Sequence, residues 1–129
     1  MTSIFSKIIS ERQAHFIYED DVCVAILDIR PANNGHCLVI PKSEIDEWTD
    51  LPADTVIHLM AISHKVGKAQ KLAFDCERVG IMIAGFEVPH AHIHLIPINS
   101  MKDFEFGTKQ ATDQELTEVK AILLSALNH

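Results

Sequence analysis

Three histidines alternate with apolar residues in one short segment, and this pattern strongly limits the conformation of that part of the chain. Residues 90–96 read His-Ala-His-Ile-His-Leu-Ile. Because successive side chains of a β-strand point to opposite faces, the alternation predicts a strand with its histidines on one face and its apolar residues in a core. The histidines are His90, His92 and His94, and the predicted core residues are Ala91, Ile93 and Leu95.

A row of imidazoles has three interpretations. It can be the solvated face of an amphipathic strand, although Thr, Ser or Lys would serve equally well there. It can bind a metal, since two histidines one residue apart on a strand can present two nitrogens to one zinc ion. It can also supply a nucleophile and acid–base groups to a phosphoryl centre, because imidazole changes protonation near neutral pH. The spacing alone does not raise the third interpretation above the second.

The remaining sequence indicates the α+β class. Its 129 residues suffice for one domain, and 47% of them are hydrophobic. Periodicity and turn signals predict a short helical segment at residues 4–9 and a long helix at 54–72, and a capping box at Thr112–Glu115 predicts a helix at about 113–127. Short strands are predicted at residues 15–18, 22–28, 36–40, 79–84 and 88–98. Mostly turn-sized connections between these strands favour an antiparallel sheet.

Composition excludes several classes of protein. Eighteen Asp and Glu against eleven Lys and Arg give a net charge of −7, which argues against a general binder of nucleic-acid polymers. A local site for a small anionic ligand is compatible with that charge. The chain lacks an apolar stretch long enough for a membrane span and a signal-peptide pattern, so we expect no membrane association and a cytoplasmic location. Three cysteines without a C-x-x-C pair are expected to be small buried hydrophobes.

The histidine segment resembles the motif of the histidine triad (HIT) family, in which three histidines are separated and followed by apolar residues. The resemblance extends from about residue 4 to residue 97 and includes the segments 4–9, 18–21, 27–31 and 35–42. It implies one HIT domain over residues 1–129, with a five-stranded antiparallel sheet and two main helices. Histidine at the third position, His94, is similar to the histidine triad nucleotide-binding and fragile-histidine-triad hydrolases, because the nucleotidyltransferase branch carries Gln there.

The resemblance implies a role for each histidine. Members of the family bind a nucleotide and cleave at its α-phosphate through a nucleotidyl-histidine intermediate, and the middle histidine, His92, is the nucleophile. His94 would contact the α-phosphate, His90 would support the nucleophile, and His36 would lie near the phosphate. A neutral imidazole can attack phosphorus and later leave, which divides one difficult displacement into two easier ones.

Nucleoside binding in the family uses one acid and an apolar slot. Asp28 matches the acid that binds the ribose hydroxyls. Phe5, Ile8, Ile26 and Ile29 match the residues around the base, although each is also compatible with an ordinary core position. No cofactor is implied. Some members hold structural zinc, but Ser3, Ser6 and Glu44 stand at those positions and serine is a poor zinc ligand, so we expect no metal.

Two residues depart from the family pattern. Phe86 and Glu87 stand where the family carries Gln and a small polar residue, and Phe86 cannot donate a hydrogen bond to phosphate. Strand alternation predicts that Glu87 points away from the histidines, and the departure suggests an altered leaving-group preference.

The expected function is that of an enzyme, a purine nucleoside phosphoramidase or related nucleotide hydrolase. A dinucleoside polyphosphate hydrolase, a nucleotide-binding module with little catalysis and a metal-dependent site remain alternatives. The expected partners are a purine nucleotide or nucleotide conjugate and a second copy of the chain, with the helix at residues 54–72 in the homodimer interface.

Overall fold

The computed structural model describes residues 2–105 and 109–128 and contains one five-stranded antiparallel sheet in the order β1-β2-β3-β5-β4. The predicted α+β class and its two main helices are confirmed, with a shorter helix at the N-terminal end. In chain order the elements are α1 (Ile4–Glu11), β1 (Phe16–Glu19), β2 (Cys23–Leu27), β3 (Cys37–Pro41), the 3-10 turn η1 (Trp48–Asp50), α2 (Ala53–Ala73), β4 (Arg78–Met82), β5 (Ile93–Ile98), the 3-10 turn η2 (Met101–Phe104) and α3 (Asp113–Leu127).

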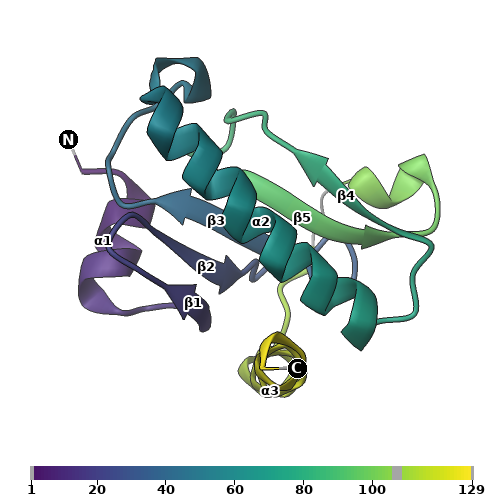
Figure 1. The fold of residues 1–129 in the computed structure, drawn as a ribbon. Coiled ribbons are helices and arrows are strands. Elements are labelled where there is room, and N and C mark those ends of the chain that lie inside the picture. The colour runs from purple at the N-terminus through teal and green to yellow at the C-terminus, as the bar shows by residue number, and fades with distance from the viewer. Residues whose placement is uncertain (1, 106–108, 129) are drawn as a thin grey trace.

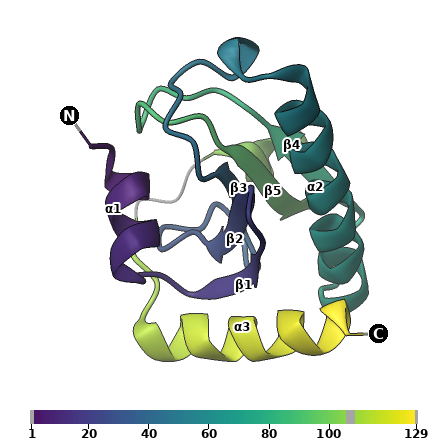
Figure 2. The same cartoon turned by 60° about the vertical axis from the view of Figure 1, so that its left-hand side comes forward.

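The helices cover the sheet from different sides. Helix α2 lies across β3, β5 and β4, while α3 packs against α2 and β1 (Figure 1). Helix α1 lies on the side of the sheet opposite α2, as the turned view shows (Figure 2). The central strands β2 and β3 are buried along their whole length. Both faces of a covered strand are shielded from water, so these strands are almost entirely apolar.

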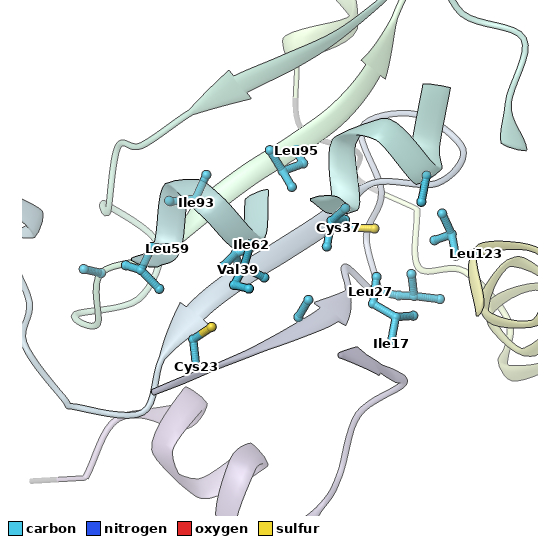
Figure 3. Packing of buried hydrophobic residues seen from close by; sticks show 14 of the residues in the cluster. Ile17, Cys23, Leu27, Cys37, Val39, Leu59, Ile62, Ile93, Leu95 and Leu123 are labelled. Carbon is cyan, nitrogen blue, oxygen red and sulfur yellow. The ribbon is translucent and has the colours of Figure 1, made fainter. Parts of the chain in front are cut away.

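The main core lies between α2 and the sheet. Leu59 and Ile62 of α2 pack in one cluster with Val39, Ile93 and Leu95 from the sheet (Figure 3). The predicted inward orientation of residues 91, 93 and 95 is therefore confirmed. The three cysteines are buried free thiols, as expected. No helix in the described ranges has the length and apolar character that a bilayer span needs.

A second, smaller core lies between α1 and the other face of the sheet. Its buried residues are Phe5, Val24, Ile26, Leu38 and Ile40. Ser3 begins α1 by accepting a hydrogen bond from the backbone N–H of Ser6, which satisfies one of the free donors of the first turn. This arrangement holds the apolar side of α1 against the sheet.

The strand prediction for residues 88–98 is wrong in its first half, because β5 begins only at Ile93. Pro89 has no N–H to donate to a ladder, and the N–H of His90 turns back to the carbonyl of Val88 at 2.8 Å. The N–H of Ala91 then donates to the carbonyl of Ile45 at 2.7 Å and not to β3. Of the three histidines only His94 is a strand residue.

Candidate functional site

One row of cross-strand neighbours forms the floor of the site. Ile26 of β2 is paired with Leu38 of β3, and Leu38 is paired with His94 of β5. Cross-strand partners point to the same face of a sheet. The row therefore places an imidazole beside two apolar side chains on the face that α1 covers.

A cavity of about 380 Å³ opens above this row. Its volume lies within the usual range of small-molecule sites, roughly 300–1,000 Å³. The predicted nucleotide-binding residues Phe5, Ile8, Ile26, Asp28 and Ile29 all line the cavity. Two predicted catalytic residues, His92 and His94, line it as well, whereas His36 and His90 lie behind that wall and reach the site through hydrogen bonds.

The proton positions on His36 and His94 follow from one backbone amide. The N–H of Ala32 donates to His36 Nδ1 at 3.0 Å, so the proton of neutral His36 is on Nε2. That nitrogen lies 2.9 Å from His94 Nδ1, which must accept. His94 consequently carries its proton on Nε2, the nitrogen that faces Glu87 at the cavity.

Both rings are neutral near pH 7. Burial, aided by the neighbouring imidazoles, lowers the pKa of His36 to about 3. Burial, and after it the neighbouring His92 imidazole, lower the pKa of His94 to about 4. The loop before His36 requires glycine at position 35 for two reasons. Gly35 has φ +88°, a conformation that favours glycine, and a Cβ there would collide with the ring of Phe74.

His92 is oriented by a carbonyl. Its Nδ1 lies 2.7 Å from the backbone oxygen of His90, an atom that can only accept, so Nδ1 carries a proton. The lone pair of a neutral His92 is then on Nε2, which lies 3.7 Å from Glu87 Oε1. The ring of Phe5 packs edge-on against the His92 ring with 4.9 Å between centroids, which limits its rotation.

His90 is held by hydrogen bonds on both ring nitrogens. Nε2 donates to the carbonyl of Pro41 at 2.8 Å, and Nδ1 accepts from the Ser3 hydroxyl at 2.6 Å. Burial lowers the pKa of this imidazole. Glu44 accepts from the Ser3 amide at 2.6 Å and from the Ser6 hydroxyl at 2.7 Å. The three residues expected at the family's zinc positions thus form a hydrogen-bonded group next to His90.

Asp28 lies at the junction between the cavity and the His36 loop. Its Oδ1 accepts from the Arg30 amide at 2.8 Å, and its Oδ2 lies 3.6 Å from His36 Nε2. Burial raises the pKa of the carboxyl group, and the Arg30 amide opposes this rise.

The expected orientation of Glu87 is wrong. Its carboxylate points toward the histidines, with Oε1 only 3.2 Å from His94 Nε2. The prediction assumed strand alternation from residue 87 onward, but residues 86–90 form a bend. The neighbouring Phe86 is 96% exposed and does not line the cavity.

Comparison with known proteins identifies the family. The sequence profile of the HIT domain matches residues 10–101, which is most of the chain. The protein belongs to the HIT family. An uncharacterized HIT-like protein of Methanocaldococcus jannaschii is 38% identical over 99 residues, which is 73% of this chain and 77% of that protein. The adenosine 5'-monophosphoramidase of Saccharomyces cerevisiae is also 38% identical, over 73% of this chain and 61% of that enzyme.

A solved structure supports the assignment independently. The crystal structure of a HIT-like protein from Bartonella henselae superposes with a TM-score of 0.87 at 30% identity, and the match covers 97% of this chain and 96% of that one. The HIT fold of this chain therefore holds over nearly its whole length.

Among the described residues, three groups of side chains have donor atoms close enough to hold a metal, and two of them lie at the cavity; the third, Asp20, Cys23 and His58, lies away from it. The donor atoms of Glu87, His92 and His94 lie within 4.8 Å of one another, and so do those of Asp28, His36 and His94. In the structure these donors are hydrogen-bonded or ion-paired with each other.

Several residues that line the cavity were absent from the sequence prediction: Ile4, Gln13, Arg30, Leu38, Glu87 and Val88. Two of them carried a usable signal. Ile4 is four residues before Ile8 on a helix, and side chains at that spacing share a face. Leu38 lies in the apolar strand after His36 and is the cross-strand partner of Ile26. Gln13 and Val88 come from irregular segments that have no periodicity.

Proposed function

We propose that this HIT protein binds a purine nucleotide conjugate and cleaves it at the α-phosphate through a nucleotidyl-His92 intermediate. One observation carries the proposal. The backbone carbonyl of His90 holds the proton on His92 Nδ1, so the lone pair of the other nitrogen is at a cavity of nucleotide size. The similarity to a yeast adenosine 5'-monophosphoramidase supports the same chemistry.

The proposed reaction has two displacements. His92 Nε2 attacks the α-phosphorus, and the bond to the leaving group breaks with its electron pair on the leaving atom, which takes up a proton. In the second step a water oxygen attacks the same phosphorus, the P–N bond breaks and its electron pair returns to Nε2, and one water proton is released. The products are the nucleoside monophosphate and the protonated leaving group.

The neighbouring residues suit this reaction. The Nε2–H of neutral His94 faces the position where a phosphate oxygen can accept, and His36 holds the proton there. Donors aimed at developing charge are commonly worth about 3–4 kcal/mol each. Asp28 is proposed to accept from the ribose hydroxyls, and the apolar residues between α1 and β2 are proposed to enclose the base.

Turnover of adenosine 5'-phosphoramidate tests the proposal. We expect AMP as product and, in acid-free quenched samples, a mass increase of one AMP on His92. His92→Asn is expected to lower kcat by on the order of 10³-fold or more because the nucleophile is lost. His64→Asn, an exposed histidine of α2, serves as the matched control and should keep the parent rate. Parent-like turnover by His92→Asn, or no AMP adduct, would contradict the proposal.

The same preparation separates the alternative functions. A dinucleoside polyphosphate hydrolase would turn over diadenosine polyphosphates faster than the phosphoramidate and would still need His92. A metal-dependent site would lose activity in a chelator. A nucleotide-binding module would bind AMP without forming the adduct.

We also propose a homodimer through α2 and β4. Trp48, Ile57, Met60 and Ile81 are at least 40% exposed and lie near an apolar cavity of about 370 Å³ between η1, α2 and β4. An exposed apolar patch of this kind is typical of a protein interface. A second copy of the chain is the partner that the family resemblance implies.

A further inference from the structure

The carboxylate of Glu87 occupies the position where the proposed mechanism needs a phosphate oxygen. Its Oε1 lies 3.2 Å from His94 Nε2, the N–H that we propose as a phosphate donor, and 3.7 Å from His92 Nε2, the proposed nucleophile. A carboxylate and a phosphate oxygen are both anionic acceptors, and both can use the same N–H. An α-phosphate within reach of His92 must therefore displace this carboxylate.

The displaced side chain stays at the mouth of the cavity. The Glu87 side chain is 38% exposed, so it can turn toward solvent. Its backbone is held nearby, since the adjacent Val88 also lines the cavity and the carbonyl of Val88 accepts from the His90 amide at 2.8 Å. When the nucleoside lies in the apolar slot and the α-phosphate lies at His92, the part of the substrate next to the mouth is the leaving group.

Charges around the cavity add to this effect. Among the described residues, the charged ones that line it are Asp28, Glu87 and Arg30. Two acids and one arginine leave a net negative lining. Of the described residues in this lining, Arg30 is the one cation that could attract a negatively charged leaving group, whereas the Glu87 carboxylate would repel it. The same carboxylate would attract a leaving group that carries an ammonium.

We infer that Glu87 is a specificity-determining residue that selects substrates whose leaving group carries a positive charge. The inference rests on the proposed function of the site and extends it to the chemistry of the leaving group. It also disfavours polyphosphate leaving groups, since these bring several negative charges to the same carboxylate.

Two adenosine 5'-phosphoramidates of similar size test the inference. One is made with ethylenediamine, so its leaving group carries an ammonium, and the other with β-alanine, so its leaving group carries a carboxylate. For the parent protein we expect kcat/KM to favour the ammonium substrate by roughly tenfold or more, which corresponds to about 1.4 kcal/mol. E87Q keeps the size and the hydrogen-bond acceptor and should reduce this ratio to about two- to threefold, while E87K should reverse it.

A matched control separates local from global charge. E118Q removes one negative charge from the exposed face of α3 and should keep the parent ratio. Thermal unfolding of each variant checks that the fold is retained. Equal ratios in the parent, E87Q and E87K would overturn the inference.

A binding measurement keeps the inference testable without turnover. Calorimetry gives the dissociation constants of both conjugates for His92→Asn alone and for His92→Asn combined with E87Q. We expect tighter binding of the ammonium conjugate that is lost with E87Q. An unchanged ratio of dissociation constants overturns the inference, whereas absence of the AMP adduct on His92 in the parent contradicts the proposed function alone.

Discussion

Asp28 is positioned for both a structural role and the proposed role in binding the ribose. One carboxylate oxygen holds the loop through the Arg30 amide, and the other faces His36 and the cavity. Burial raises the pKa of this acid, which means that the surroundings disfavour its charge. A ligand that donates hydrogen bonds to the carboxylate would relieve that cost, and a ribose has two hydroxyls that can do so.

Asp28→Asn is expected to weaken binding of adenosine by about 10- to 100-fold, since a hydrogen bond to a charged group contributes about 1.5–3 kcal/mol. Binding of 2',3'-dideoxyadenosine, which lacks both hydroxyls, should change little. Calorimetry with these uncharged nucleosides avoids any effect of Asp28 on phosphate. Asp21→Asn, at an exposed turn, is the control. Equal losses for both nucleosides would show that Asp28 does not contact the ribose.

At the level of residues, the sequence predicts the members of the site better than their orientations. The family resemblance assigned Phe5, Ile8, Ile26, Asp28 and Ile29 to nucleoside binding, and all five line one cavity, while their role stays a prediction. Glu87 was assigned the wrong direction because period-two alternation applies only within a strand. A bend at Pro89 could be suspected from the sequence, but the direction in which a bend turns a side chain depends on contacts such as that of Ala91 with Ile45.

At the level of elements, α1 is more than a cover for the sheet. Ser3 caps the helix and donates to His90 Nδ1, and Glu44 accepts from the Ser3 amide. His90 in turn positions His92 through its carbonyl. The start of α1, the end of β3 and the segment before β5 are therefore tied together beside the proposed nucleophile.

Ser3→Ala is expected to lower the free energy of unfolding by about 1–3 kcal/mol, because a buried acceptor on His90 loses its donor and α1 loses its cap. Urea denaturation measures this change. Ser10→Ala, at an exposed position of the same helix, should change stability by less than about 0.5 kcal/mol. The hydrogen-bonded group has no structural importance if the two variants are equally stable.

The helices were predicted well and β5 less well, for physical reasons. The long helix expected at residues 54–72 is α2, Ala53–Ala73, and the capping box at Thr112 and Glu115 begins α3. Periodicity over many residues and a local cap are both visible in one sequence. The start of β5 depends on which carbonyl accepts the hydrogen bond from the Ala91 amide. That acceptor, Ile45, is far away in the sequence, so no local pattern predicts it.

For the whole molecule, the exposed apolar face of α2 and β4 is the feature with the largest consequence for assembly. We expect the protein to sediment as a dimer, and we expect Ile57→Glu to shift it to the monomer, since Ile57 is 68% exposed and its replacement disturbs little within one chain. Ile122→Glu on α3, where Ile122 is 46% exposed, is the matched control. Sedimentation velocity measures both, and a monomeric parent protein contradicts the proposed dimer.

The assembled site was beyond what periodicity alone can predict. Its residues come from α1, β2, β3, β5 and the segments before β3 and β5. Before the fold was known, only the family resemblance related these segments to one another. The HIT assignment and the α+β class are confirmed. A single domain over residues 1–129, the cytoplasmic location and the role of each site residue stay predictions.

The amide of Ala32 has an influence that extends well beyond its loop. Through His36, the backbone N–H of residue 32 decides which nitrogen of His94 carries the proton. The proton positions on the two imidazoles therefore do not depend on most side chains at position 32. Proline is the exception, because it alone has no hydrogen there to give. Of the twenty amino acids, therefore, one would remove the hydrogen bond that fixes the proton positions on both His36 and His94.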